Sequence, residues 1–212
     1  MSDSPSPCLA FTSLSYERDD TPLFQPVSGE LRAGEIMQIE GPNGCGKTTL
    51  LRMLATSLKA SQGDIYWRQQ SLSFVRQSYL ADMLFIGHQP GVKQELTPLE
   101  NLHYWGRVAA CENRLSDEAA LNRIGLAGYE DVPCYSLSAG QLRRVALARL
   151  LTSQATIWLL DEPFTAIDRQ GVADLLTLLT DHTGRGGIVI LSTHQDLDLP
   201  DVRRLSLARV VA

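Results

Sequence analysis

The chain from Ile36 to Thr48 reads IMQIEGPNGCGKT, a short apolar strand that runs directly into a glycine-rich loop. The last eight residues fit the pattern G-x-x-x-x-G-K-[ST], whose glycines let the backbone turn successive N–H groups toward phosphate oxygens. Lys47 would place a cation against the phosphates, and the Thr48 hydroxyl would reach Mg²⁺. The residues expected to bind phosphate are Gly41, Pro42, Asn43, Gly44, Cys45, Gly46, Lys47, Thr48 and Thr49. A strand, such a loop and a helix in this order predict an α/β fold.

The phosphate loop alone does not identify one class of protein. Leucines recur at helical spacing after it and predict a helix over residues 47–58. The alternative, a glycine-rich turn that leaves Lys47 in solvent, is disfavoured by the strand before the loop and the helix after it. GTPases and small nucleotide kinases carry similar loops, but the sequence has no N-K-x-D base-reading motif and no Arg-rich lid. Residues further along the chain must therefore distinguish the classes.

Strand and helix patterns alternate outward from the loop on both sides. The expected strands are residues 9–15, 35–40, 64–67, 84–86, 157–161 and 188–192. The expected further helices are residues 138–151 and 168–179. Strands that alternate with helices predict parallel βαβ units around one sheet.

The middle of the chain has a different character. Between residues 96 and 135 two helical patterns follow each other, one opened by Pro98 and one preceded by Ser116. This block interrupts the strand–helix alternation, so it is expected to be a helical insertion. We therefore expect one domain over residues 1–212, with a core of about residues 8–90 and 136–212 and a helical subdomain of about residues 91–135.

A second apolar strand, residues 157–161, leads into the acidic pair Asp161 and Glu162. The carboxyl ends of parallel strands line the ligand crevice of an α/β sheet, so both acids are expected near the phosphate loop. Phosphoryl transfer needs one carboxylate for the metal and another to orient the attacking water. These tasks are assigned to Asp161 and Glu162, respectively. The alternative is that one of these acids only caps the start of a helix after a buried strand. The presence of a phosphate loop in the same chain disfavours this alternative.

Residues 137–141, Leu-Ser-Ala-Gly-Gln, identify the family that the chain resembles. They match the L-S-G-G-Q signature of ABC ATPases, with Ala139 in place of the first glycine. Together with the phosphate loop and the acidic pair, in the same order and spacing, they make the chain similar to ABC ATPases over nearly its full length. The resemblance implies a RecA-like P-loop NTPase core, an antiparallel β subdomain and an inserted α-helical subdomain. It also implies ATP and Mg²⁺ as ligands.

The same resemblance implies roles for residues outside these motifs. Gln89 is similar to the Q-loop glutamine that joins Mg²⁺ and water to the helical subdomain. Residues 165–168 are similar to the loop that contacts the second ATPase of a dimer, and His194 to the switch histidine on the γ-phosphate. The implied catalytic residues are Lys47, Glu162 and His194, and the implied metal ligands are Thr48, Gln89 and Asp161.

Ser138, Gly140 and Gln141 would complete a nucleotide site in a second copy of the chain. In ABC ATPases two copies sandwich two ATP molecules head to tail, so the signature of one closes the site of the other. The N–H groups and hydroxyl at a helix start form an anion site, which agrees with this role. The alternative is that Ser138 and Gln141 only form a capping box, and the two roles are compatible.

The base-binding position departs from the family pattern. Many ABC ATPases carry an aromatic residue there, whereas the matching position here is Arg18, with Tyr16 two residues earlier. The planar guanidinium of Arg18 could stack on adenine. Both residues are therefore candidates, and relaxed nucleotide choice is compatible with the sequence.

Residues 84–102, LFIGHQPGVKQELTPLENL, resemble the Q-loop region of the ATPase subunits of cytochrome c maturation complexes. The short chain after His194 and the arginine at position 18 fit the same family. The resemblance implies integral membrane partners of the cytochrome c maturation B and C type, and ATP hydrolysis that supports haem export or delivery. It also implies a peripheral position on the cytoplasmic face of the bacterial inner membrane. The alternatives are the ATPase of a different exporter and an ABC ATPase without a transport role.

Two further expectations concern individual side chains. Val92, Leu96, Leu99 and Tyr104 are candidates for a groove that receives a helix of the membrane partner. The alternative is that they fill the core of the helical subdomain, which is the better expectation for any single one. His88 would help shape the loop at Gln89. His103 and His182 are expected on the surface, without a role.

Composition limits the kinds of partner. The 212 residues carry 19 Lys and Arg against 24 Asp and Glu, a net charge of −5, with no Lys/Arg-rich block. This argues against nucleic acid as a partner, and so against ABC ATPases that act on DNA or ribosomes. No apolar run approaches the roughly 20 residues that span a bilayer, so no direct membrane insertion is expected. Four scattered cysteines without a C-x-x-C pair predict free thiols.

Overall fold

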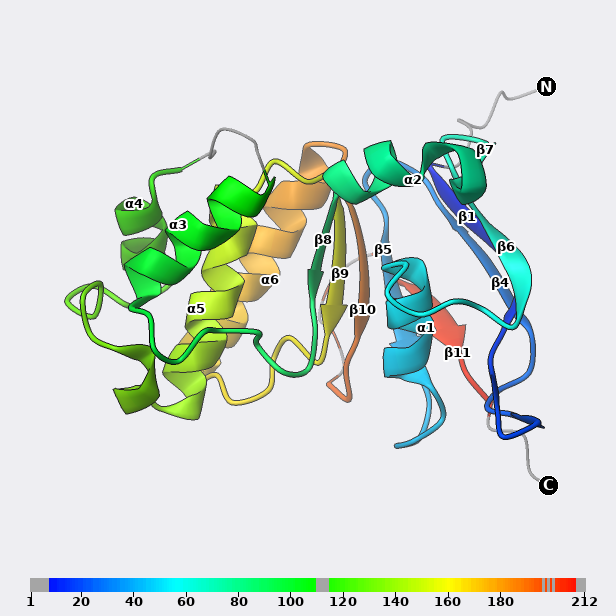
Figure 1. Cartoon of the computed structure of the whole chain (residues 1–212), viewed down its shortest axis with the longest axis horizontal. Coiled ribbons are helices and arrows are strands. Elements are labelled where there is room, and N and C mark those ends of the chain that lie inside the picture. Colours follow the sequence, from blue (N-terminus) through cyan, green and yellow to red (C-terminus); the bar gives the residue numbers. More distant parts are fainter. Residues whose placement is uncertain (1–7, 110–114, 196, 198, 200, 209–212) are drawn as a thin grey trace.

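The computed structural model describes residues 8–109, 115–195, 197, 199 and 201–208. Helix α1 (Lys47–Leu54) lies between two β-sheets, and a group of helices forms the other end of the molecule (Figure 1). One sheet is parallel and the other antiparallel. The predicted α/β core with an antiparallel sheet and a helical part is therefore confirmed.

The larger sheet carries the phosphate loop. Its five parallel strands lie in the order β11-β5-β10-β9-β8. They span Ile36–Glu40 (β5), Met83–Ile86 (β8), Ile157–Asp161 (β9), Ile188–Ser192 (β10) and Arg203–Ser206 (β11). Every residue of β9 and β10 is buried, as is typical of parallel strands whose two faces are covered by helices. The loops that follow β5, β8, β9 and β10 leave the sheet at one edge, where a ligand is expected.

The smaller sheet packs against the opposite side of α1. Its strands lie in the order β4-β1-β6-β7 and pair antiparallel. They span Leu9–Ser15 (β1), Val27–Leu31 (β4), Gln62–Trp67 (β6) and Gln70–Ser71 (β7), and a hairpin of Glu17–Arg18 (β2) and Thr21–Pro22 (β3) follows β1. Phe11 of β1, Leu50 of α1 and Ile190 of β10 belong to one buried cluster. Burial on both sides fixes α1, and with it the phosphate loop, between the two sheets.

Helices α5 (Ala139–Thr152) and α6 (Arg169–Gly184) pack on the parallel sheet through a second buried cluster, which includes Leu147, Trp158 and Leu175. The outer side of α5 packs against a third cluster. That cluster joins α3 (Pro98–Ala109), α4 (Asp117–Arg123) and the 3₁₀ turn η1 (Cys134–Ser136). Helix α5 therefore contacts both the sheet and the helical end.

Helix α1 is shorter than the predicted 47–58. Thr56 takes a φ of +54° and its N–H bonds the carbonyl oxygen of Met53, while the N–H of Ser57 bonds that of Arg52. A left-handed residue at this position ends a helix and satisfies its last carbonyl groups. Leu58 packs against the core although it lies after the end of α1. Its apolar position therefore matched a helical pattern without being part of the helix.

Helix α2 (Leu72–Ala81) and the strands β4 and β11 were not predicted. Only Leu72 and Tyr79 of the α2 residues are buried, whereas Phe74 is 88% exposed. The backbone at Val75 is not helical, so α2 consists of two short helical segments joined at a kink. Its apolar residues consequently form no continuous stripe that a sequence pattern could reveal.

His182 is buried, so the prediction of a surface position was wrong. Its ring stacks on Trp158, with ring centroids 3.6 Å apart, and its Nε2 lies 3.2 Å from the carbonyl oxygen of Thr156. Both partners lie at strand β9 or just before it, far from His182 along the chain. The burial of this imidazole therefore results from a long-range contact without a local sequence pattern.

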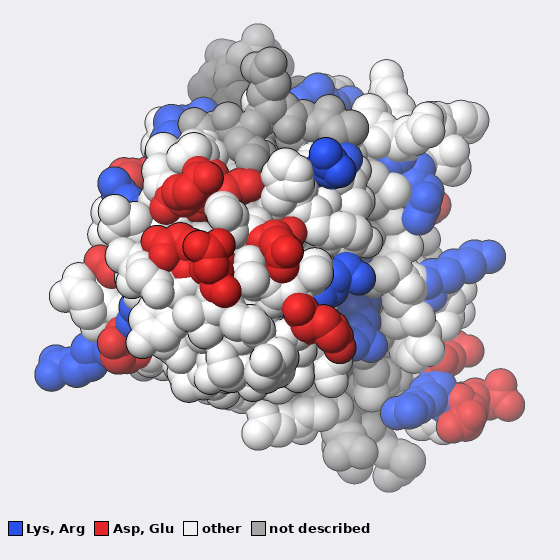
Figure 2. Space-filling view, turned by 60° about the vertical axis from the view of Figure 1, so that its left-hand side comes forward, with Lys and Arg blue, Asp and Glu red and all other residues white. Residues whose placement is uncertain are grey.

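The helical end carries a negative surface. Figure 2 shows acidic side chains gathered on this face, with Lys and Arg side chains toward its margins. Such a surface does not favour the phosphate backbone of a nucleic acid. Within the part of the chain that the structure describes, no helix is both long and apolar enough to span a bilayer.

Candidate nucleotide-binding site

The loop between β5 and α1 has the backbone geometry of an anion site. Gly46, directly before α1, takes a φ of +106°, and a Cβ atom there would lie 2.5 Å from the Phe24 ring. Glycine satisfies both constraints. The N-cap residue, Gly46, has no side chain that could cap α1, so the first N–H groups of the helix can donate to a phosphate.

Lys47 is folded over this loop. Its Nζ donates to the carbonyl oxygen of Gly41 at 2.8 Å and lies 3.5 Å from that of Pro42. The same atom lies 3.4 Å from Nε2 of His194. Lys47 is only 7% exposed, and a buried ammonium group requires such oxygen partners. Its charge is thereby placed directly over the phosphate loop.

The carboxylate of Asp161 is held from two sides at the end of β9. Its Oδ2 accepts a hydrogen bond from Thr48 Oγ1 at 2.8 Å, and its Oδ1 accepts one from Ser192 Oγ at 2.7 Å. Asp161 is 1% exposed, and these hydroxyl groups offset the cost of burying its charge. Carboxylate and hydroxyl oxygens are the hard ligands that Mg²⁺ prefers, so Thr48 and Asp161 fit that ion.

Glu162 follows in an unusual backbone conformation. Its φ of +49° lies in the left-handed region that residues other than glycine rarely adopt. Its N–H donates to the carbonyl oxygen and to the hydroxyl of Ser192, each at 3.1 Å. Its Oε1 lies 3.4 Å from Nε2 of His194. The two side chains that follow β9 and β10 thus meet beside the phosphate loop.

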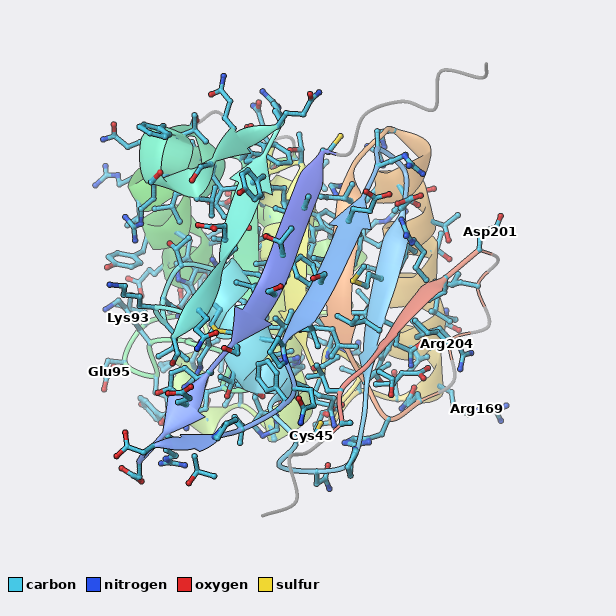
Figure 3. The ribbon with its side chains drawn as sticks, turned by 90° about the vertical axis from the view of Figure 1, so that its right-hand side faces the viewer. Cys45, Lys93, Glu95, Arg169, Asp201 and Arg204 are labelled. Carbon is cyan, nitrogen blue, oxygen red and sulfur yellow. The ribbon has the colours of Figure 1, made fainter. Side chains whose placement is uncertain are left out.

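These groups converge on one open pocket of about 640 Å³. Its walls come from the β2–β3 region, the phosphate loop and the loops after β8, β9 and β10. The lining residues are Arg18, Leu23, Asn43, Gly44, Gly46, Lys47, Thr48, Thr49, His88, Asp161, Glu162, Thr165 and His194. Figure 3 shows Cys45 near the lower end of the antiparallel sheet, in the phosphate loop. Cys8, Cys45 and Cys134 are free thiols, as predicted; Cys45 and Cys134 are buried and Cys8 is partly buried, whereas Cys111 lies outside the described residues.

Seven predicted site residues are not among those that line this pocket, and three of them, Gly41, Pro42 and Cys45, belong to the phosphate loop itself. Gln89 is exposed on the loop after β8, although its neighbour His88 does line the pocket. The other three, Ser138, Gly140 and Gln141, lie at the start of α5. In Figure 1 the starts of α1 and α5 face the same end of the molecule but lie on opposite sides of the parallel sheet. The structure thus separates two potential anion sites within one chain.

The residues at the start of α5 also have structural tasks within the chain. Ser138 and Gln141 form a capping box, with Gln141 N–H bonded to Ser138 Oγ at 3.2 Å and Ser138 N–H bonded to Gln141 Oε1 at 2.9 Å. A Cβ atom on Gly140 would lie 2.6 Å from the carbonyl oxygen of Ala166. Gly140 therefore lets α5 approach the loop after β9 closely, while Ser138 stays exposed at the surface.

Two residues that shape the site were missed by the sequence analysis. Ser192 binds both Asp161 and Glu162, but a serine at a strand end gives no distinctive pattern. Arg143 is buried on α5 and donates to the backbone around the acidic pair. It lies four residues before the buried Leu147, and a charge on the apolar side of a helix is a signal that could have revealed it.

Comparison with known proteins agrees with this geometry. The ABC transporter family matches residues 24–165, which include the phosphate loop, the signature and the acidic pair. The cytochrome c biogenesis ATP-binding export protein CcmA of Escherichia coli (strain K12) is 52% identical over 206 residues, covering 96% of this chain and 98% of the relative. The protein of the same name from Yersinia pestis is 51% identical over 202 residues, covering 94% and 93%.

A solved structure described as an ABC transporter ATP-binding protein from Pyrococcus furiosus has the same fold. Its TM-score is 0.79 at 27% identity, over 94% of this chain and 96% of that chain. The similarity thus extends beyond the phosphate loop, the signature and the acidic pair to the sheets and to the helical end. The chain belongs to the ATP-binding proteins of the ABC transporter family and, within them, to the cytochrome c biogenesis ATP-binding export proteins.

Proposed function

We propose that this chain is the ATP-hydrolysing subunit of an ABC transporter that serves cytochrome c biogenesis. The observation that carries the proposal is the convergence of Lys47, Thr48, Asp161, Glu162 and His194 on one pocket at the carboxyl edge of the sheet. Phosphoryl transfer needs this set of groups: a cation, metal ligands and a carboxylate that orients water. The relatives named above, similar over nearly the whole chain, support the biological role.

Each of these residues has a task in the proposed reaction. Lys47 exchanges its loop carbonyl partners for β- and γ-phosphate oxygens, and the N–H groups at the start of α1 hold the same phosphates. Thr48 and Asp161 would hold Mg²⁺, which would neutralise part of the phosphate charge. Glu162 orients the attacking water and accepts its proton, while His194 donates to the γ-phosphate.

We assign Gln89 as a further residue that would bind Mg²⁺ and water. Because Gln89 is exposed outside the pocket, this role requires its loop to rearrange. The loop continues through Pro90 and Gly91, and Gly91 takes a φ of +69°. Among the residues that the structure describes, none other than its chain neighbours has an atom within 4 Å of a Cβ position at Gly91, and this open, left-handed glycine suits a hinge into residues 91–135. We assign that stretch to the helical subdomain.

The second nucleotide contact comes from another copy of the chain. Ser138, Gly140 and Gln141 are not among the residues that line the pocket of their own chain, and Ser138 is exposed at the start of α5. In a head-to-tail dimer this anion site would close over the γ-phosphate of the partner chain. ATP binding would then favour the closed dimer and hydrolysis the open one, which provides a two-state motion for transport.

The motor needs membrane-embedded partners. We assign it to subunits of the cytochrome c maturation B and C type, with haem as the exported or delivered group. The chain would then be peripheral on the cytoplasmic face of the bacterial inner membrane. Candidate contacts are Val92, Leu96, Leu99 and Tyr104, of which Tyr104 is 44% exposed and the other three are partly buried. Tyr104 is thus the most accessible of the four to a partner helix.

Replacement of Glu162 by Gln tests the catalytic assignment. Glu162→Gln keeps the size and hydrogen bonding of the side chain but removes the base, so kcat should fall by roughly 100-fold or more. Nucleotide binding should persist, because Lys47 and the loop N–H groups are unchanged. The measurement is ATP turnover beside nucleotide affinity, with Glu130→Gln on the helical end as a control. Normal turnover in Glu162→Gln would refute the role of Glu162.

Affinity purification from detergent-solubilised membranes tests the biological role. Recovery of cytochrome c maturation membrane subunits with the tagged chain is the expected result. Recovery with permease subunits of another exporter would keep the motor and reject the cytochrome assignment. Recovery only from the soluble fraction, with nucleic acid or ribosomes, would reject the transport role.

A further inference from the structure

Arg143 of α5 is a buried charge that the scheme above does not use. It is 3% exposed, and its guanidinium reaches the backbone after β8 and β9. Nη2 donates to the carbonyl oxygens of Asp161 at 2.9 Å and Glu162 at 2.7 Å. Nη1 donates to the carbonyl oxygen of Gly87 at 2.8 Å. One side chain thereby joins two loops that border the nucleotide pocket.

The arginine is suited to this task by its shape. A guanidinium presents five N–H donors in one plane, whereas a lysine ammonium is a compact point charge on a flexible stem. Burial lowers the pKa of Arg143, while the nearby charges of Asp161 and Glu162 oppose that shift. Its hydrogen bonds go to main-chain carbonyl oxygens, which makes Arg143 a clamp on backbone geometry.

The clamp acts where the backbone is strained. Glu162 has a φ of +49°, and such a conformation persists only when its surroundings hold it. Ser192 holds the N–H of Glu162, and Arg143 holds its carbonyl oxygen. The direction of the Glu162 side chain, which brings its Oε1 to 3.4 Å from His194, follows from that backbone.

We infer that Arg143 is a positioning residue for hydrolysis, which fixes the Glu162 carboxylate and the loop after Gly87 relative to helix α5. The inference rests on the proposed function, because it assigns a consequence to the role of Glu162. Gly87 directly precedes His88, which lines the pocket, and Gln89. Ser138 starts the same helix that carries Arg143, so a displacement of α5 would reach Glu162 through this guanidinium.

The decisive experiment measures steady-state ATP hydrolysis by the full chain together with its co-purified membrane subunits. Arg143→Lys and Arg143→Gln should each lower kcat by about 10- to 100-fold, because a small displacement of a catalytic group is enough for such a loss. The KM for ATP should change by less than about threefold, since the phosphate-binding groups are untouched. Free guanidinium should partly restore kcat in Arg143→Ala and have no such effect in Glu162→Gln.

Arg149→Gln is the matched control. Arg149 lies on the same helix, and burial lowers its pKa to about 10, but its guanidinium lies over the Trp105 ring at 4.6 Å, away from the pocket. Its replacement should destabilise α5 to a similar extent while kcat stays within about twofold of the wild type. An equal loss of kcat in Arg149→Gln, or a loss confined to KM in the Arg143 variants, would overturn the inference.

Amide hydrogen exchange separates this inference from the proposed function. In Arg143→Gln, but not in Arg149→Gln, the amide of Glu162 and the backbone of residues 87–89 should exchange faster. This readout needs no turnover, so it decides the positioning role even where the chain hydrolyses no ATP. Unchanged exchange of both segments in Arg143→Gln would refute the clamp. If the wild type hydrolyses no ATP but exchange is faster in Arg143→Gln, only the proposed hydrolysis is refuted.

Discussion

At the scale of single residues, the two candidates for stacking on the nucleotide base have different surroundings. Arg18 is exposed on β2 and lines the pocket together with Leu23. Tyr16 is partly buried and packs against the core cluster around α1, so its ring already has partners. Arg18 is therefore free to lay its guanidinium plane on a base, and Tyr16 is not.

Arg18→Ala should weaken ATP binding by roughly 2- to 30-fold, the range expected from a lost stacking interaction between a cation and an aromatic ring. Tyr16→Leu, which keeps an apolar side chain in the core, should leave the affinity near that of the wild type. Equilibrium binding of ATP and GTP to both variants measures the effect. Equal affinities of Arg18→Ala and the wild type would exclude Arg18 as the stacking residue.

The residues of the site differ in how far the sequence reveals them. Lys47, Thr48 and Asp161 fall in short motifs whose spacing follows from the geometry of phosphate and metal binding, and all three line the pocket. Ser192 and Arg143 act on the same acidic pair through contacts between segments far apart in the sequence. Such contacts depend on how the sheet and α5 pack together, which no local pattern encodes.

At the scale of elements, helix α6 starts at an acidic cap whose strength depends on pH. The Asp168 side chain accepts a hydrogen bond from the N–H of Gly171 at 2.8 Å and one from Arg144 Nη2 at 2.7 Å. The bond from Gly171, followed by the charge of Arg144, holds the pKa of Asp168 below its usual value of 3.8. The folded protein thus favours the ionised carboxylate.

The contribution of this cap to stability should therefore be fully present above pH 3.8 and be lost as the pH falls through the lowered pKa of the folded state. Asp168→Asn keeps a good capping side chain but removes the charge. Its urea midpoint should lie below that of the wild type at about pH 6, and the difference should narrow on acidification. A difference that does not change with pH would show that the charge makes no contribution.

Elements were predictable where a helix cap and a dense run of apolar residues coincide. Helix α5 has both, because the capping box at Ser138 is followed by the buried run Val145–Ala148, which packs against two clusters. Helix α2 lacks such a run and bends at Val75, so its sequence gives no helical period. Helix α1 stops at Leu54 because Thr56 adopts a left-handed conformation that its residue type does not predict.

At the scale of the whole molecule, the pocket of one chain holds only part of the proposed nucleotide contacts. The pocket contains Lys47 and the acidic pair, whereas the start of α5 lies across the sheet at the same end of the molecule (Figure 1). Because the parallel sheet lies between them, the start of α5 cannot contact a nucleotide in the pocket of its own chain. Two chains related by a two-fold axis would place each α5 start opposite the other chain's phosphate loop.

This arrangement predicts complementation between two inactive variants. Lys47→Ala removes the phosphate cation, and Ser138→Asp keeps the helix cap but places a negative charge against the partner's γ-phosphate. In a mixed dimer, the phosphate loop of the Ser138→Asp chain meets the intact signature of the Lys47→Ala chain, so one complete site forms. With random pairing of independent sites, an equal mixture should recover about a quarter of wild-type ATP turnover.

The matched control is a chain that carries both substitutions. Mixed with either single variant, it forms no complete site, so those mixtures should stay inactive. If the mixture of single variants also stays inactive while the Ser138→Asp chain still binds ATP, the signature does not act across the dimer. Recovery in the mixture of single variants, but in neither mixture with the doubly substituted chain, would mean that hydrolysis requires both chains, because the start of α5 in one chain completes the nucleotide site of the other.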